Sequence, residues 1–163
     1  MDINTLKDLY IEQLRDLHSA ESQVEAVAPA IIDAATNETL KTAIRHHHQA
    51  AQQRQQQIKA IVEKHGAKAT GHKCKGMEGL IKEAKDMVGE HDDAPGAVLD
   101  AGIITHAQRM LHYELAGFGT VNTYAQELGD DASFFQEVLD QTYDADRTLT
   151  DLAANTINPK AEA

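Results

Sequence analysis

Apolar residues recur along most of the chain at spacings of three, four and seven, which are the spacings of one face of an α-helix. The first such stretch begins near Ile3 or Asn4, with Asp2 or Asn4 as its cap, and runs to about Ala35. Pro29 falls inside it and predicts a kink or a local irregularity, because proline lacks the backbone N–H.

A second helix is predicted from about Glu38 to His65, capped by Thr36 or Asn37 and stopped by Gly66. Both of its ends are apolar, but its middle reads RHHHQAAQQRQQQ. If this middle packs, it must direct some of five polar side chains toward the core: His47, His48, Gln49, Gln52 and Gln55. If it is solvated instead, the two alanines between them, at positions 50 and 51, make the contact.

Three further helices follow. A short one is predicted from Gly76 to about Val88, between two polar loops. A long one has Asp93 as its cap and Pro95 in its first turn, and runs to Leu128 before Gly129. The last is capped by Asp130 or Asp131 and ends near Asn155, which leaves residues 159–163 as a loose C-terminal tail.

The lengths of the links predict how these helices are arranged. Short links join the first long helix to the second and the third to the fourth, so each pair should be an antiparallel hairpin. One long excursion, which holds the short helix, separates the two pairs. We therefore expect residues 1–158 to form one all-α domain, a ferritin-like antiparallel four-helix bundle with one long crossover containing a short fifth helix. A plain up-down bundle with an inserted helix is the alternative.

Composition narrows the class of protein. A formal net charge of -11 argues against a nucleic-acid or anionic-membrane surface. No apolar run reaches the roughly 18–20 residues of a membrane helix, and the first residues do not resemble a signal peptide. The lone cysteine, Cys74, allows no internal disulfide and fits a reducing compartment. We therefore expect a cytoplasmic protein, in which Cys74 is either a thiol activated by its neighbouring lysines or a buried structural thiol.

One carboxylate stands out because it falls on an apolar stripe. Glu114 lies three residues after Leu111 and four before Phe118, and Glu21 interrupts the first helix in the same way. Because helix midpoints in such a bundle lie at one level, the second helix should bring Gln49 and Gln52 to this layer. The fourth should bring Asp146, one turn after Thr142.

Metal-carboxylate bundles have this layout, with a Glu from each of two helices and a Glu-x-x-His from each of the other two. Here Gln49-x-x-Gln52 stands in place of one such motif, and Asp146 is the acidic residue of the last helix. The alternative is that Glu21 and Glu114 are hydrogen-bonded to buried histidines or glutamines, or share a proton. Asp146 would then be the partner of a nearby arginine, Arg109 or Arg147.

Four segments give the chain a resemblance to a known family: DLYIEQLRDLHSAESQ, KCKGMEGLIKEA, HYELAGFGT and LTDLAANTIN. It resembles the YciF/YciE family of bacterial stress-associated, ferritin-like proteins along almost its whole length. The resemblance implies a helical bundle, a homodimer, and a dinuclear metal centre in members that keep the ligands. Glu21 and Glu114 match family carboxylates, and Asp146 matches an acidic position. Gln49 and Gln52 stand where the family pattern is Glu-x-x-His.

Two functional hypotheses follow. The first is a stress-associated bundle whose di-metal centre is degenerate or absent, which binds no cofactor and acts by binding or assembly rather than as an enzyme. The second is a non-haem iron or manganese protein that uses Glu21, Glu114 and Asp146, with Gln52 or a histidine, in peroxide or dioxygen chemistry. That protein would be a metal-dependent oxidoreductase. No nucleotide-binding loop, CxxC pair or catalytic triad is present in the sequence.

Overall fold

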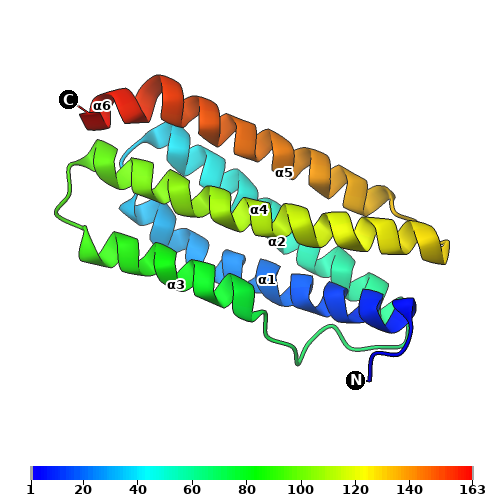
Figure 1. Cartoon of the computed structure of the whole chain (residues 1–163). Coiled ribbons are helices and arrows are strands. Elements are labelled where there is room, and N and C mark those ends of the chain that lie inside the picture. The colour runs from blue at the N-terminus through cyan, green and yellow to red at the C-terminus, as the bar shows by residue number, and fades with distance from the viewer. Residues whose placement is uncertain (1, 163) are drawn as a thin grey trace.

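The computed structural model describes residues 2–162, and within that range the chain forms helices and no strands. Four long helices make the bundle (Figure 1). They are α1 (Leu6–Ala34), α2 (Glu38–Lys64), α4 (Gly96–Leu128) and α5 (Ser133–Leu152). The remaining elements are α3 (Lys75–Glu90), the π-helix η1 (Ala153–Ile157) and α6 (Asn158–Glu162).

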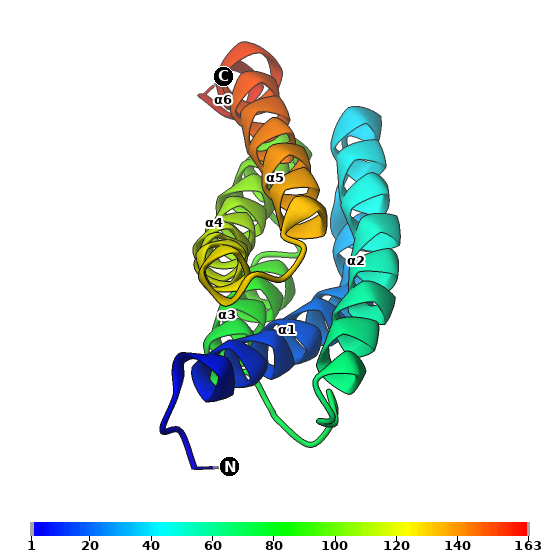
Figure 2. The same ribbon diagram turned by 90° about the vertical axis from the view of Figure 1, so that its right-hand side faces the viewer.

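The helices are connected as the link lengths predict. Helices α1 and α2 form one antiparallel hairpin, and α4 and α5 form the other (Figure 1). Helix α4 runs antiparallel to α1 and parallel to α2, so the connection from α2 to α4 must travel back along the bundle (Figures 1 and 2). It does so through α3, which packs against α1 and α4. This confirms the four-helix bundle with one long crossover and excludes the plain up-down alternative.

Two helix boundaries are as predicted and several differ, including the start of α5, whose cap position is Ala132 and not Asp130 or Asp131. Asn37 caps α2 by accepting from the amides of Thr39 and Leu40, and Gly129 ends α4 with a φ of 74°. The cap of α1, however, is Thr5, whose hydroxyl accepts from the amide of Asp8 in a capping box. Helix α4 begins directly after Pro95 without a side-chain cap, so the prediction for Asp93 was wrong.

The C-terminal residues are more helical than the sequence predicts. The chain continues from α5 through η1 into α6, so residues 158–162 are not a loose tail, and α6 packs against α4. The amide of Asn158 donates to the carbonyl of Ala153, five residues earlier. This π-helical turn, which is wider than an α-helical one, comes just before Pro159, and proline has no amide hydrogen to donate. Met1 and Ala163, at the ends of the predicted domain and tail, lie outside the described residues.

A buried aspartate ties the α1–α2 link to α4. Asp100 is 1% exposed and accepts two hydrogen bonds from Thr36, one from the amide and one from the hydroxyl, each 2.7 Å long. Ionised or polar groups at such a site are tolerated when hydrogen bonds replace their water. Gly96 lies against the same threonine, because a Cβ there would come within 2.8 Å of its hydroxyl. These contacts hold the start of α4, where the crossover ends, against the α1–α2 link.

The apolar core consists of two clusters that adjoin along the bundle. On α1, one cluster includes Tyr10 to Leu17 and the other begins at Ala20. On α4, the division falls between Leu111 and Leu115. The other two helices divide in the same way, and buried polar residues stand at or next to the division on each helix. These four residues, which we call the polar layer, are Glu21, Arg54, Glu114 and Thr142.

Candidate functional site

The polar layer lies in the middle of the bundle and excludes water almost completely. Glu21 on α1 and Glu114 on α4 are 0% exposed, and Arg54 on α2 is 3% exposed. Thr142 on α5 is 1% exposed, but its hydroxyl donates to the carbonyl of Val138 on its own helix. The chemistry of the layer therefore depends on two carboxylates and one guanidinium.

Arg54 lies between the two carboxylates. Its Nε is 3.0 Å from Oε2 of Glu21, and its terminal nitrogen is 3.6 Å from Oε2 of Glu114. Neither carboxylate oxygen of Glu21 accepts a hydrogen bond from the described residues, so the contact with Arg54 is an ion pair by distance. A guanidinium cannot lose its proton in a protein, which makes this a permanent internal cation.

His47 extends the layer from a position two turns before Arg54 on α2. Its Nε2 lies 3.1 Å from Oε1 of Glu114 and 3.4 Å from the terminal nitrogen of Arg54. Glu114 therefore has two partners on α2, and each of its oxygens is close to one of them. His47 and Arg54 therefore compensate the buried carboxylate of Glu114, and these contacts connect α2 to α4 across the bundle.

The surroundings move the pKa values of the two carboxyls in opposite directions. Burial raises the pKa of Glu21 well above its usual range, and the charge of Glu114 raises it further, whereas Arg54 opposes both. Burial also acts to raise the pKa of Glu114, but attraction and hydrogen bonding from His47, together with Arg54, outweigh it and lower the pKa. Glu21 is thus the member of the pair that keeps its proton to higher pH.

The structure brings together only two of the five residues that the sequence singled out, Glu21 and Glu114. Gln49 is exposed, and Gln52 is exposed and donates to Oε1 of Glu25 at 2.8 Å. Both amides therefore lie outside the layer, and the prediction that they line it was wrong: each falls two residues, or about 200° around the helix axis, before a position that lies inside. The positions of α2 that lie inside are Ala51 and Arg54.

Asp146 also lies apart from the layer. Its carboxylate accepts from Gln108 at 2.9 Å and lies 3.2 Å from Nε2 of His112, on a part-exposed surface between α4 and α5. It pairs with neither of the arginines suggested by the sequence, since Arg109 pairs with Glu83 and Arg147 with Asp144.

Arg54 is the functional residue that the sequence analysis missed, and a signal for it existed. The buried positions of α2 are Leu40, Ala51, Arg54, Ile58 and Val62. Arg54 follows Ala51 by three and precedes Ile58 by four, so it continues the apolar stripe in register. The polar composition of the middle of α2 concealed that continuity.

The donors present do not fit the di-metal centre that the bundle layout implies. Where α2 would supply a Glu and a His three residues apart, it has Ala51 and Arg54. On α5 the corresponding inward pair is Thr142 and Ala145. Within residues 2–162, no three His, Cys, Asp or Glu side chains are grouped so that they could hold a metal ion. The pair of carboxylates instead has a cation from its own chain.

The lone cysteine belongs to a separate cluster where α3 begins. The Sγ atom of Cys74 lies 3.1 Å from Oδ2 of Asp16 and 2.9 Å from the hydroxyl of Tyr113. Cys74 is 0% exposed and caps α3 by accepting from the amide of Met77. Burial raises the pKa of its thiol, which favours the structural thiol over the activated one.

Comparisons with known proteins agree with the architecture. Residues 5–162 match the protein family described as "Domain of unknown function (DUF892)". Protein YciF of Escherichia coli (strain K12) is 36% identical over 165 residues, which is 99% of this chain and 98% of that protein.

Two solved structures are also similar. The crystal structure of the E. coli stress protein YciF matches with a TM-score of 0.88 at 34% identity, over 96% of this chain and 99% of that one. YcfI of Rhodopseudomonas palustris, provisionally described as a structural protein, matches with a TM-score of 0.85 at 36% identity. The match covers 91% of this chain and 95% of that one. These matches confirm the resemblance to YciF that the sequence motifs indicate. No helix among the described residues is long and apolar enough to cross a membrane.

Proposed function

The chain belongs to the DUF892 family of YciF-like proteins, and from this premise we propose that it is a stress-associated bundle protein that acts by binding or assembly and not by redox turnover at a di-metal centre. The stress-related role is supported by the description of the E. coli relative as a stress protein. The absence of a di-metal centre is supported by the polar layer of this chain.

The observation that carries the proposal is the position of Arg54 between Glu21 and Glu114. A divalent ion bound by these two carboxylates would sit next to a guanidinium that is already within 3.0 to 3.6 Å of both. Repulsion between two cations is strong where water is excluded, and Arg54 cannot relieve it by losing a proton. The carboxylates are thus neutralised by the chain itself, and neither inward pair on α2 or α5 replaces the missing ligands.

Elemental analysis tests this proposal directly. Protein produced with iron, manganese and zinc in the medium is purified without chelators, and its metal content is compared with that of the Glu114→Gln variant. We expect the two to be equal and close to background. About one or two equivalents of metal per chain, lost in Glu114→Gln, would establish the iron or manganese protein in its place. If Glu114→Gln does not fold, the metal content of the unmodified protein decides the matter by itself.

Assembly is the second part of the proposal, and the homodimer is its simplest form. Light scattering coupled to size-exclusion chromatography measures it, and we expect a mass of about twice the 17.8 kDa of one chain. A mass of one chain at every concentration would contradict the dimer while leaving the assignment of the polar layer unchanged.

A further inference from the structure

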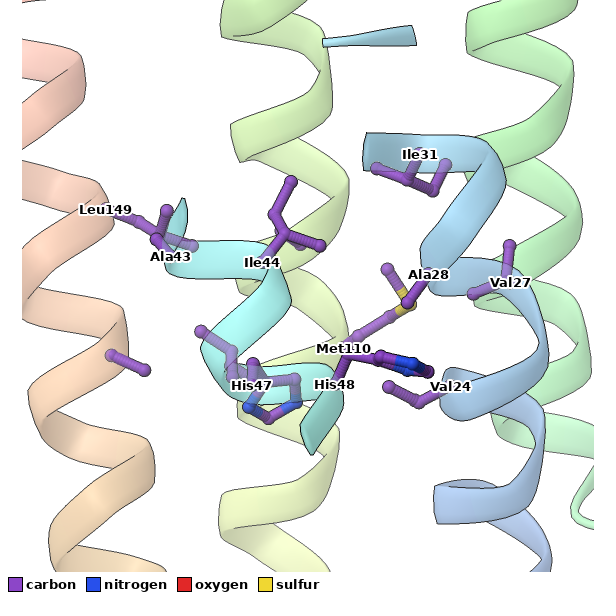
Figure 3. Close-up of a pocket in the computed structure, with 13 residues that line it drawn as sticks. Val24, Val27, Ala28, Ile31, Ala43, Ile44, His47, His48, Met110 and Leu149 are labelled. Carbon is purple, nitrogen blue, oxygen red and sulfur yellow. The ribbon is translucent and has the colours of Figure 1, made fainter. Parts of the chain in front are cut away.

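An apolar pocket lies beside the polar layer, on the side that faces the α1–α2 link. Its volume is about 60 Å³, and its lining comes from all four bundle helices (Figure 3). Of the 13 lining residues, 11 are apolar, and the other two are His47 and His48. Protein interiors contain few voids larger than a water molecule, so a space of this size next to a buried ion network calls for an explanation.

The space exists because small side chains meet at one level. Each of the four bundle helices contributes an alanine to the lining: Ala28 from α1, Ala43 from α2, Ala107 from α4 and Ala145 from α5. A leucine at any one of these positions would add three carbon atoms and fill much of the pocket. A core built for stability alone would gain by such a substitution, because each buried methylene contributes about 0.8 kcal/mol.

The lining decides which kind of molecule fits. A stable water needs two to four polar partners, and the walls offer one unpaired polar atom, Nδ1 of His48, which has no hydrogen-bond partner among the described residues. His47 already uses its Nε2 for Glu114, at 3.1 Å. An engineered apolar cavity of about 150 Å³ in another protein stays dry and binds benzene or xenon. The present pocket is less than half that size, so it suits a smaller apolar molecule.

We propose that this pocket is a binding site for one small apolar molecule, of about two to four non-hydrogen atoms or the size of a xenon atom. This inference is independent of the proposed function, because it uses the packing of Ala28, Ala107 and Ala145 and not the charge state of the polar layer. A ligand would contact Met110 and Leu149, which also line the pocket.

Xenon is the probe that tests the site, with the protein labelled at its methionine methyl groups. The chain has four methionines, and of these Met110 lines the pocket. We expect the methyl signal of Met110 to shift with xenon pressure until it saturates, while the signals of Met77 and Met87 stay nearly fixed. The absence of a saturable shift at Met110 would overturn the proposal.

Two variants localise the effect. Ala107→Leu should abolish the shift at Met110, and the matched control Ala116→Leu, on the exposed side of the same helix, should keep it. A shift that persists in a folded Ala107→Leu protein would also overturn the site. If that variant does not fold, Ala145→Leu replaces it. The opposite change, Leu149→Ala, should enlarge the pocket so that it binds benzene, which the unmodified protein should not bind.

Discussion

The Nε atom of Arg54 lies 3.0 Å from Oε2 of Glu21, in the centre of the bundle, and both side chains are almost completely removed from water. They come from neighbouring helices of the first hairpin, and Glu114 of the second hairpin completes the group. Desolvating three ionisable groups is costly, and their attraction compensates for that cost only while every partner is present. This dependence makes the layer testable by substitution.

Replacing the cation should be the most damaging single change. In Arg54→Met the carboxylates of Glu21 and Glu114 stay buried without their shared partner, so we expect the free energy of unfolding to fall by about 3–5 kcal/mol. Urea unfolding followed by far-ultraviolet circular dichroism measures it. The triple variant Glu21→Leu, Arg54→Met, Glu114→Leu should recover most of the loss, because it also removes the charges left unpaired.

The matched control for this change is Gln56→Met, on the exposed side of the same helix. It should alter the free energy of unfolding by less than about 0.5 kcal/mol. A loss in Arg54→Met that is no larger than that of the control would show that the ion pairs contribute nothing to stability.

The raised pKa of Glu21 predicts a specific dependence of stability on pH. Burial raises this pKa above the 4.5 of an unperturbed glutamate, so between the two values the folded chain holds a proton that the unfolded chain releases. Stability is therefore lost as the pH rises through this window, by up to about 1.4 kcal/mol for each pH unit. Glu21→Gln lacks the titration, so its stability relative to the unmodified protein should increase as the pH rises.

Glu114 provides the opposite case. Its pKa is lowered, so the stability that it contributes is present above 4.5 and is lost as the pH falls through its folded pKa. Glu127→Gln, at an exposed position on the same helix, is the control for both. Urea midpoints measured at intervals between about pH 3 and pH 8 should diverge from those of the unmodified protein above 4.5 for Glu21→Gln and below 4.5 for Glu114→Gln, and should run parallel for the control. Parallel curves for all variants would contradict the assignment of the proton to Glu21.

Cys74 should be nearly inert in the folded protein. It is 0% exposed, and burial raises the pKa of its thiol, so little thiolate is available at neutral pH. We expect Ellman's reagent to react at least about 100-fold more slowly with the native protein than with the urea-unfolded chain. Ser22→Cys, at an exposed position in a Cys74→Ala background, should react quickly. If Ellman's reagent reacted equally fast with Cys74 and with the cysteine introduced at position 22, Cys74 would be an activated thiol and not a structural one.

If the layer has lost a di-metal centre, restoring the ligands should restore binding. The variant Ala51→Glu, Arg54→His, Thr142→Glu, Ala145→His places a Glu-x-x-His on both α2 and α5, beside the existing Glu21 and Glu114. We expect it to bind about one or two equivalents of iron or manganese per chain by elemental analysis.

A matched control separates the ligands from the cation. The variant that carries Ala51→Glu, Thr142→Glu and Ala145→His but keeps Arg54 should bind less metal than the same variant with Arg54→Met, because the guanidinium still occupies the layer. A folded four-fold variant without metal would show that these inward positions do not have the geometry of a ligand set.

The fold was predictable because its information is local. Apolar spacing defined the long helices, and the short links at Ala35 to Asn37 and Gly129 to Ala132 defined the two hairpins. The helical end from Asn158 was missed, because a π-turn just before Pro159 lets the chain continue where proline usually ends a helix.

The site was predictable only in part, because it depends on which faces of different helices meet. Glu21 and Glu114 stood out as charges on apolar stripes. The partner of both, Arg54, was hidden in a polar segment, and a shift of two residues in the inferred face of α2 was enough to select Gln49 and Gln52 in its place. The pocket is less visible still, since four alanines become a feature only when packing places them at one level.

The two hydrogen bonds from Thr36 to Asp100 have a consequence for how this end of the bundle opens. Thr36 lies in a link between helices, where amide hydrogens usually exchange rapidly with solvent. Its amide instead donates over 2.7 Å to a carboxylate that is 1% exposed and 64 residues away in the chain. The exchange of this hydrogen requires the contact between the α1–α2 link and α4 to break, so a loop amide reports on the opening of that contact.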